Sequence, residues 1–161
     1  MPIAQYRNKV YNRNVIEQDL KVINSIYKGK LIINDYIEFI DFADGLHIGQ
    51  EDLLKYGSFE KIRAKVGEKL LGLSTHNKEE IKEANSLKLD YIGLGAYRAT
   101  NTKQEARVHG DALLDIAKIS KHKVALIGGV KLSDNFNKEA NISYKVIASA
   151  LVKEFLNHKQ L

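Results

Sequence analysis

The stretch LIINDYIEFIDFADGLHIGQEDL, residues 31–53, holds two short apolar segments, and each of them runs into acidic and amide residues. The first segment, residues 31–33, is followed by Asn34 and Asp35, and the second, residues 46–48, leads through a glycine into the Gln-Glu-Asp of residues 50–52. Continuous apolar runs of this length are typical of parallel strands that are buried on both faces. Because ligands bind at the carboxyl ends of such strands, the stretch predicts a polar site at one edge of a parallel sheet.

The same alternation of short apolar runs and amphipathic segments continues along the chain. Helical patterns lie between the runs, at residues 14–27, 77–88, 111–120 and 149–158. The apolar residues predicted to share one face of the first helix are Val15, Ile16, Leu20, Ile23 and Ile26. The second helix is predicted to begin at Asn77, with Glu80 completing a capping box. The predicted strands are residues 2–6, 30–34, 45–49, 69–74, 90–95, 123–129 and 144–149.

Strands that alternate with helices at a spacing of about 20 residues predict βαβ units and a parallel sheet. An open flavodoxin-like sheet has about five or six strands, and a complete (β/α)8 barrel needs at least about 200 residues. Seven strands in 161 residues therefore favour an α/β fold of the (β/α)8 TIM-barrel type that lacks the first βα unit.

Composition limits the class of protein. With 161 residues, 44% of them hydrophobic, the chain can bury one sizeable core, so we expect a single domain over residues 1–161. The chain has no cysteine, which excludes disulfides and thiolate metal sites. Arg7 and Lys9 stand where a signal peptide needs apolar residues, and every apolar run is too short to cross a bilayer. We therefore expect a soluble cytoplasmic protein that has no membrane partner.

The net charge of +5 raises the question of nucleic acid as a partner. The lysines are interleaved with glutamates along the helical segments, and basic blocks with interleaved aromatic residues are absent from the sequence. This pattern indicates a solvated surface and argues against a nucleic-acid partner. A mildly basic protein also suits phosphorylated small molecules.

The ends of the predicted strands carry a set of polar and glycine residues. Each has a structural interpretation: Asp52 and Ser74 can cap the segments that follow them, and Gly128 and Gly129 can form a plain turn. Together, however, cations, separated carboxylates and glycine turns on one rim suit phosphorylated ligands, and oxygen ligands such as Asp35 and Asp52 suit Mg²⁺. The set comprises Gln5, Arg7, Lys9, Asn34, Asp35, Gln50, Asp52, Ser74, Thr100, Thr102, Lys103, Gly128, Gly129 and Ser149.

The set falls into two regions that favour phosphate, one around the two carboxylates and one around Gly128, Gly129 and Ser149. Two phosphorylated ligands are therefore expected. The five histidines do not have the spacing of a metal site. His47, inside a predicted strand, is interpreted as a packed, hydrogen-bonded residue.

In sequence order, these residues resemble the thiamine phosphate synthase family, within the superfamily of synthases and thiazole tautomerases that fold as (β/α)8 barrels. QYRNK at residues 5–9 resembles the family's Q-L-R-E-K, and the opening stretch resembles its I-I-N-D and A-D-G-V-H-L-G-Q-x-D-L. Later segments resemble G-x-S-x-H, D-Y-I-G-x-G-P-x-F-x-T-x-T-K, I-G-G-I and A-V-V-S-A-I. The likeness covers the whole chain, and its specific part is the pair I-N-D and H-x-G-Q-x-D.

The resemblance implies that hydroxymethylpyrimidine diphosphate and thiazole phosphate are joined to give thiamine phosphate, with release of pyrophosphate. It implies Mg²⁺ as the cofactor, held by Asp35 and Asp52. Arg7, Lys9 and Lys103 would stabilise the charge of the departing diphosphate. Residues implied to hold the pyrimidine diphosphate are Gln5, Arg7, Lys9, Asn34, Ser74 and Lys103, and those implied to hold the thiazole phosphate are Thr100, Thr102, Gly129, Ala148 and Ser149.

The chain also departs from the family pattern. The first strand and helix of the family, roughly 35 residues, have no counterpart, Ala96 replaces a proline, Arg98 replaces an apolar residue, and Tyr144 replaces a glycine. Two alternatives to a synthase follow. One is a non-catalytic relative that binds phosphorylated ligands, and the other is a thiazole tautomerase-like enzyme, whose family carries a histidine at the position of Ala96.

An absent first βα unit would leave open sheet edges at residues 2–6 and 144–149. Proteins cover or pair such edges. The apolar residues Leu151, Val152 and Phe155 would also lose a neighbouring helix, and exposure of so much apolar surface is unusual for a monomer. We therefore expect a homodimer that buries this flank.

Overall fold

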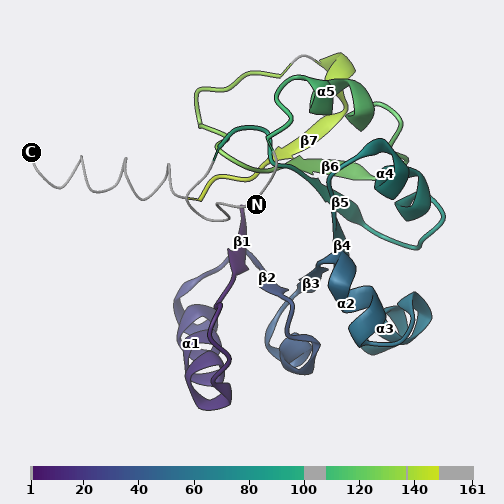
Figure 1. Cartoon of the computed structure of the whole chain (residues 1–161). Helices are drawn as coiled ribbons and strands as arrows, with labels where there is room; N and C mark the ends of the chain where they lie inside the picture. Colours follow the sequence, from purple (N-terminus) through teal and green to yellow (C-terminus); the bar gives the residue numbers. More distant parts are fainter. Residues whose placement is uncertain (1, 100–107, 137, 149–161) are drawn as a thin grey trace, which may run out of the picture. The chain divides into compact units, whose positions relative to one another are not determined.

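The computed structural model describes residues 2–99, 108–136 and 138–148. The contacts between residues divide the chain into two compact units, residues 1–73 and residues 74–161, which are described separately. Strands and helices alternate through both units (Figure 1). The elements are β1 (Ile3–Tyr6), α1 (Arg13–Ile26), β2 (Lys30–Asn34), the 3₁₀ helix η1 (Ile37–Phe42), β3 (Gly45–Ile48), α2 (Gln50–Lys55), α3 (Phe59–Val66), β4 (Leu70–Thr75), α4 (Lys78–Ala84), β5 (Tyr91–Leu94), α5 (Ala112–Ala117), β6 (Lys123–Leu126), the 3₁₀ helix η2 (Lys138–Ala140) and β7 (Ile142–Lys145).

The seven strands follow one another in chain order within the sheet, and each strand pair with a determined register is parallel. In the first unit, β1 pairs with β2, β2 with β3, and β3 with β4. In the second, β5 pairs with β6 and β6 with β7. The predicted number of strands and their parallel alternation with helices are therefore confirmed.

The core of the first unit forms around β2 and β3. Residues 31–33 of β2 and all four residues of β3 are buried, as expected for strands covered on both faces. Phe39 and Ile40 of η1 add two buried side chains beside them. The connection from β2 to β3 therefore uses one short 3₁₀ helix, and Asp35 follows directly where β2 ends.

Helix α1 begins at its cap Asn12, whose side chain accepts a hydrogen bond from the Val15 N–H at 3.2 Å. Ile16 and Leu20 are fully buried, but Val15 is 43% exposed and Ile26 73% exposed. The prediction of one apolar face was wrong for Val15 and Ile26, because at 100° per residue both lie about a quarter turn away from the buried stripe.

The second unit contains the predicted N-cap of α4, Asn77. The Asn77 side chain accepts a hydrogen bond from the Glu80 N–H at 2.9 Å. The Glu80 carboxylate in turn accepts hydrogen bonds from the Asn77 amide and the His76 N–H, at 2.8 and 2.9 Å. The helix therefore begins where the sequence predicted, but the Glu80 carboxylate accepts from the Asn77 side chain and the His76 N–H, whereas a capping box would use the Asn77 backbone N–H.

Two strand predictions in the second unit need correction. Strand β6 ends at Leu126, before the predicted boundary at residue 129, because Gly128 and Gly129 have φ values of +96° and +60° and turn the chain. Strand β7 is Ile142–Lys145, earlier than the predicted 144–149, and its register with β6 shifts between Val124 and Ala125. Tyr144 therefore lies within the strand and is exposed.

The described part of the chain has no helix long and apolar enough to span a membrane. The predicted helix at residues 149–158, with Leu151, Val152 and Phe155, lies outside the described residues. The division into two units does not test the prediction of a single domain over residues 1–161, which stays a prediction.

Candidate functional site

The strongest candidate site lies in the first unit, where β2 and β3 end. Asn34 closes β2 and is buried, and Asp35 follows it with a φ of +69°, in the left-handed region. The Asp35 N–H donates to the His47 carbonyl at 2.9 Å, and the Asp35 carbonyl accepts from the Tyr56 hydroxyl at 2.6 Å. The backbone of Asp35 is thus held on both sides, which fixes where its carboxylate emerges.

Asp52, the other predicted metal ligand, lies in the first turn of α2 and is only 4% exposed. Its Oδ2 accepts a hydrogen bond from the Gly49 N–H at 2.9 Å, so the capping role that the sequence left open is present. One oxygen of the carboxylate satisfies the helix start. The capping bond also fixes the orientation of the carboxyl group at the end of β3.

Asp35 is close enough to Asp52 for the charge of Asp52 to affect its titration. Burial, followed by the nearby Asp52 carboxylate, raises the pKa of Asp35 to about 6. Two smaller contributions are included in this pKa: the Arg7 guanidinium lowers it, and Glu51 raises it. Two carboxylates and one guanidinium therefore act on the Asp35 carboxyl group at this end of the sheet, so the structure brings Arg7, Asp35 and Asp52 near one another.

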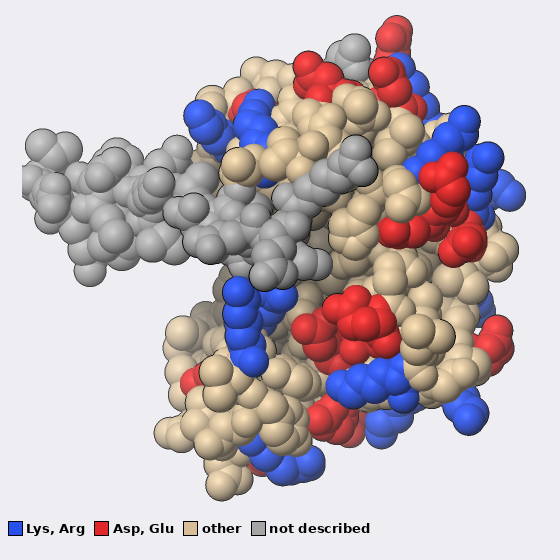
Figure 2. All heavy atoms as spheres, in the orientation of Figure 1, with Lys and Arg blue, Asp and Glu red and all other residues tan. Residues whose placement is uncertain are grey.

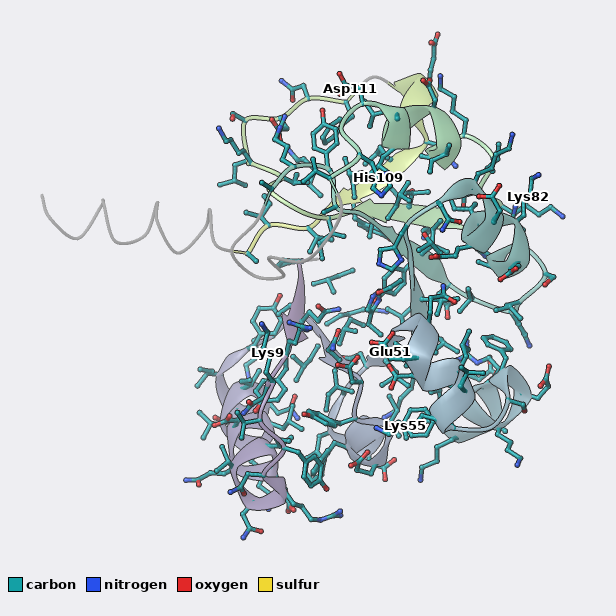
Figure 3. The ribbon with its side chains drawn as sticks, viewed as in Figure 1. Lys9, Glu51, Lys55, Lys82, His109 and Asp111 are labelled. Atoms are coloured by element: carbon teal, nitrogen blue, oxygen red, sulfur yellow. The ribbon has the colours of Figure 1, made fainter. Side chains whose placement is uncertain are left out.

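Sequence reasoning did not assign a role to Glu51. The position that a Cβ on Gly49 would occupy lies 2.6 Å from Glu51 Oε2, so the Glu51 carboxylate folds back over the backbone at the end of β3. In Figure 3, Glu51 and Lys9 lie on opposite sides of β2, and in Figure 2 acidic and basic side chains gather at the same two places. The sequence did offer one signal for Glu51, which is its position directly before Asp52.

Gln5, Arg7 and Lys9 come from β1 and the loop that follows it, and all three side chains are exposed. The loop is held at its centre, because the Tyr36 hydroxyl donates to the Asn8 carbonyl at 3.1 Å. The predicted cations, Arg7 and Lys9, therefore lie on an anchored loop that begins directly after β1.

His47 is confirmed as a packed residue. It is 8% exposed in the middle of β3. Burial, with a smaller contribution from Arg7, lowers its pKa to about 4, so the imidazole is neutral at physiological pH. A neutral buried histidine next to Asn34 in the sheet register adds no charge to the acidic end.

The acidic end fits Mg²⁺ by the chemistry of its donors. Among residues 2–99, 108–136 and 138–148, no group of three or more histidine, cysteine, aspartate or glutamate side chains has an arrangement that could hold a metal ion. A site of two carboxylates remains, and Mg²⁺ is commonly bound through one or two carboxylates together with waters and substrate phosphates. Asp35 and Asp52 are the residues that would hold the ion.

The other predicted site residues lie in the second unit. Ser74 is half-buried near the end of β4, and the neighbouring Thr75 hydroxyl donates to the Gly93 carbonyl at 3.1 Å. Gly129 lies in the turn after β6, and Ala148 is exposed beyond β7. Thr100, Thr102, Lys103 and Ser149 lie outside the described residues.

The turn at Gly128 and Gly129 is held by an ion pair that the sequence did not predict. Arg98 donates to both Asp134 oxygens, at 2.6 and 3.2 Å, and to the Gly129 carbonyl at 3.1 Å. The hydrogen bonds between the two side chains raise the pKa of Arg98 and lower the pKa of Asp134. A Cβ on Gly129 would lie 2.8 Å from the Arg98 Cβ, so glycine allows this close approach.

Comparison with known proteins adds a second line of evidence. The family model described as thiamine monophosphate synthase matches residues 1–150. A thiamine-phosphate synthase of Persephonella marina is 38% identical over 136 residues, which are 80% of this chain and 63% of that protein. One of Methanococcus maripaludis is 34% identical over 146 residues, which are 87% of this chain and 69% of that protein. The chain thus spans roughly two thirds of the length of these relatives.

A solved structure has the same fold. Thiamine phosphate pyrophosphorylase from Pyrococcus furiosus matches with a TM-score of 0.72 and 21% sequence identity, over 98% of this chain and 81% of that chain. The predicted fold class, an α/β fold of TIM-barrel type with seven parallel strands, is confirmed.

Proposed function

Because the chain belongs to the thiamine monophosphate synthase family, we propose that it joins hydroxymethylpyrimidine diphosphate and thiazole phosphate to give thiamine phosphate and pyrophosphate. The observation that carries this proposal is the acidic end of the first unit. There, Asp35, a residue with a pKa raised by burial and by Asp52, lies within the field of Arg7. This arrangement of hard oxygen ligands and a cation suits a diphosphate bound with Mg²⁺.

In the proposed reaction, the bond between the pyrimidine methylene carbon and the diphosphate breaks, and the thiazole nitrogen forms the new bond to that carbon. Mg²⁺, when bound by Asp35 and Asp52, would neutralise charge on the diphosphate. Arg7 and Lys9 donate hydrogen bonds to its oxygens as negative charge develops there. Gln5 and Asn34 orient the pyrimidine diphosphate, and Ser74 and Lys103 are assigned to the same substrate by family resemblance.

The thiazole phosphate is assigned to the second unit. Gly128 and Gly129 present a turn whose backbone is fixed by the Arg98–Asp134 pair, and such turns allow backbone N–H groups to approach a phosphate. Gly129 and Ala148 belong to this assignment, together with Thr100, Thr102 and Ser149. By holding the thiazole phosphate in one position, the turn would orient the thiazole nitrogen for reaction, and this is its proposed contribution.

The structure also bears on the tautomerase alternative. Ala96 is buried and 6% exposed, and its methyl group cannot transfer a proton. The position at which tautomerases carry a histidine therefore has no acid or base of its own. This favours the synthase.

The test is a coupled assay for thiamine phosphate with the purified 161-residue chain, both substrates, and Mg²⁺ added or omitted. We expect product only when Mg²⁺ is present. Binding of pyrimidine diphosphate without product, when thiazole phosphate and Mg²⁺ are both present, would support the non-catalytic alternative instead. No binding of either substrate would refute both.

The predicted homodimer and the cytoplasmic location belong to the same proposal. In support of a dimer, β1 pairs with β2 along one edge, and its other edge has no partner strand in the described part of the chain. Ile3 on this strand and Val22 and Ile26 on α1 are exposed. The small phosphorylated substrates remain the proposed ligands, and the cytoplasmic location stays a prediction of the sequence.

A further inference from the structure

Two tyrosines follow Asp35 in the chain, Tyr36 directly and Tyr56 at the end of α2, and the hydroxyl of each donates to a backbone carbonyl of the candidate site. Tyr56 donates to the carbonyl of Asp35 at 2.6 Å, and Tyr36 donates to the carbonyl of Asn8 at 3.1 Å. Neither residue belongs to the set that the sequence assigned. Both hydroxyls act on segments whose side chains are the proposed ligands of metal and diphosphate.

Tyr56 contacts the backbone of both aspartates. It is the residue that closes α2, and its N–H donates to the Asp52 carbonyl at 2.9 Å while its hydroxyl holds the Asp35 carbonyl. The Lys55 ammonium lies 5.0 Å from the centre of the Tyr56 ring, which restricts the ring further. One side chain therefore links the helix that carries Asp52 to the turn that carries Asp35.

The Asp35 turn needs such a restraint. A non-glycine residue with a φ of +69° is uncommon and persists where surrounding contacts define it. Three hydrogen bonds hold its backbone: the Asp35 N–H donates to the His47 carbonyl, and the Asp35 carbonyl accepts from the Ile37 N–H at 3.2 Å and from the Tyr56 hydroxyl at 2.6 Å. Without the hydroxyl, the shortest of the three bonds is lost, and with it the bond that connects the Asp35 turn to α2.

Tyr36 restrains the cationic loop instead. Its ring packs edge to face against Tyr11, with ring centres 5.3 Å apart, and its own N–H donates to the Asn34 carbonyl at 2.9 Å. Tyr36 is thus restrained through its ring and its backbone, and its hydroxyl holds the carbonyl of Asn8, the residue between Arg7 and Lys9.

We propose that Tyr56 and Tyr36 are positioning residues with separate tasks: Tyr56 sets the Asp35 carboxylate against Asp52 for the metal ion, and Tyr36 sets the Arg7–Lys9 loop for the anion. The ligand part of this inference rests on the proposed function. The backbone part does not, because it concerns the ligand-free protein.

The experiment compares Tyr56→Phe and Tyr36→Phe with Tyr27→Phe as the matched control. Tyr27 closes α1 as Tyr56 closes α2, and it lies before β2, away from the strand ends of the site. Amide hydrogen exchange is measured by NMR in the ligand-free full chain. Inorganic pyrophosphate is then titrated by calorimetry with and without Mg²⁺, and thermal unfolding is recorded for each variant.

We expect Tyr56→Phe to accelerate exchange of the Asp35 amide and to reduce the affinity gain that Mg²⁺ gives to pyrophosphate, on the order of tenfold, as for residues that support metal ligands. Its affinity without Mg²⁺ should be unchanged. Tyr36→Phe should accelerate exchange at Val10, whose N–H donates to the Asn8 side chain at 3.0 Å. It should weaken pyrophosphate binding with and without Mg²⁺ by the same factor. Tyr27→Phe should change neither property.

Exchange rates at Asp35 and Val10 that match the control would overturn the inference. So would affinity losses that are the same in both variants and follow their loss of thermal stability. If the wild-type chain binds no pyrophosphate, the proposed function fails, and the exchange rates alone decide whether the two tyrosines hold these backbones.

Discussion

Asp35 joins two unfavourable features in one residue. Its backbone lies in the left-handed region, which costs a non-glycine residue on the order of 1–3 kcal/mol, although aspartate tolerates it better than most. Its carboxylate also lies beside Asp52 and Glu51, and burial with these charges raises its pKa to about 6. Such a residue lowers stability, and a role in binding a cation would explain why it is placed there.

The first prediction is that Asp35→Asn stabilises the protein at pH 7. The folded-state pKa of about 6 lies above the ordinary value of 3.8, so the folded state holds the proton more tightly and stability falls as the pH rises from about 4 to about 6. The shift corresponds to at most about 3 kcal/mol, and we expect about 1–2 kcal/mol after solvent screening. Asparagine also tolerates a positive φ.

Urea unfolding at pH 7 and pH 4 measures this effect. The gain should be present at pH 7 and absent at pH 4, where the carboxyl group of the wild type is largely protonated in the folded state. Asp41→Asn, at an exposed position of the same unit, serves as the control. Equal stability of the wild type and the Asp35 variant at pH 7 would contradict the electrostatic argument.

The second prediction concerns activity. Asp35→Asn and Asp52→Asn should each abolish Mg²⁺-dependent synthesis of thiamine phosphate, because each removes an anionic oxygen ligand. The fold should persist, since the amide oxygen at position 52 can still accept the Gly49 N–H. The assay is run with circular dichroism on the same samples. Activity within about threefold of wild type, roughly 0.6 kcal/mol in barrier, would remove these residues from the metal site.

The third prediction separates Arg7 from a merely solvated loop. Arg7→Ala should weaken binding of pyrimidine diphosphate by about 1.5–3 kcal/mol, the usual contribution of a hydrogen bond to a charged group. Arg13→Ala is the matched control, because Arg13 lies over the Phe39 ring and is not assigned to the diphosphate. Calorimetric titration of both variants decides the point, and equal affinities would assign Arg7 to the solvent-exposed surface.

At the residue scale, the sequence predicted Asp35, Asp52 and Arg7 because acids and cations that follow apolar strands meet at one edge of a parallel sheet. It could not predict Tyr56 or Tyr36. Their contacts use hydroxyl groups on backbone carbonyls 21 and 28 residues away, which leave no spacing pattern in the chain. Glu51 was missed for a different reason, since only the folded-back side chain places its charge beside Asp35.

Among the elements, the strands were predicted better than the faces of the helices. Strand β2 has the predicted bounds because its apolar run starts after Gly29 and stops at a polar pair. Strand β7 was displaced because Asn141, with a φ of +56°, turns the chain directly before it. The exposed apolar residues of α1 were assigned to the core because the period of the helix shows which residues share a stripe and not which stripe is covered.

The fourth prediction tests the start of α4. Asn77→Ala should lower the free energy of unfolding by about 1 kcal/mol, because it leaves the Glu80 N–H without its side-chain acceptor. Asn77→Ser retains an acceptor and should cost less. Urea unfolding of the two variants gives the comparison, and equal losses would show that the capping bond contributes little to stability.

For the whole molecule, the order of the strands could be predicted because each βα unit places its strand beside the preceding one. The residues proposed for the thiazole phosphate all belong to residues 74–161, whereas both proposed metal ligands and most of the residues proposed for the pyrimidine diphosphate belong to residues 1–73. The candidate site residues of each unit could be predicted from local patterns, because strand ends and glycine turns are determined by short stretches of sequence. The proposed synthesis uses residues of both units, so the activity assay tests the whole chain.

The last prediction concerns association. Val15, Val22 and Ile26 fall within about 40° of each other around α1, and they are 43%, 53% and 73% exposed. This apolar stripe is separate from the buried stripe of Ile16 and Leu20. A second copy of the chain would bury it, as is common for contiguous apolar surface.

Light scattering at micromolar concentration should therefore give twice the chain mass of 18.2 kDa. Ile26→Glu should shift the mass to that of a monomer, because a charge in an apolar contact is costly to bury. Leu54→Glu, at an exposed leucine of α2, should leave the dimer intact. A wild-type chain that scatters as 18.2 kDa would refute the dimer, and a dimer that Ile26→Glu leaves intact would place the contact on another surface.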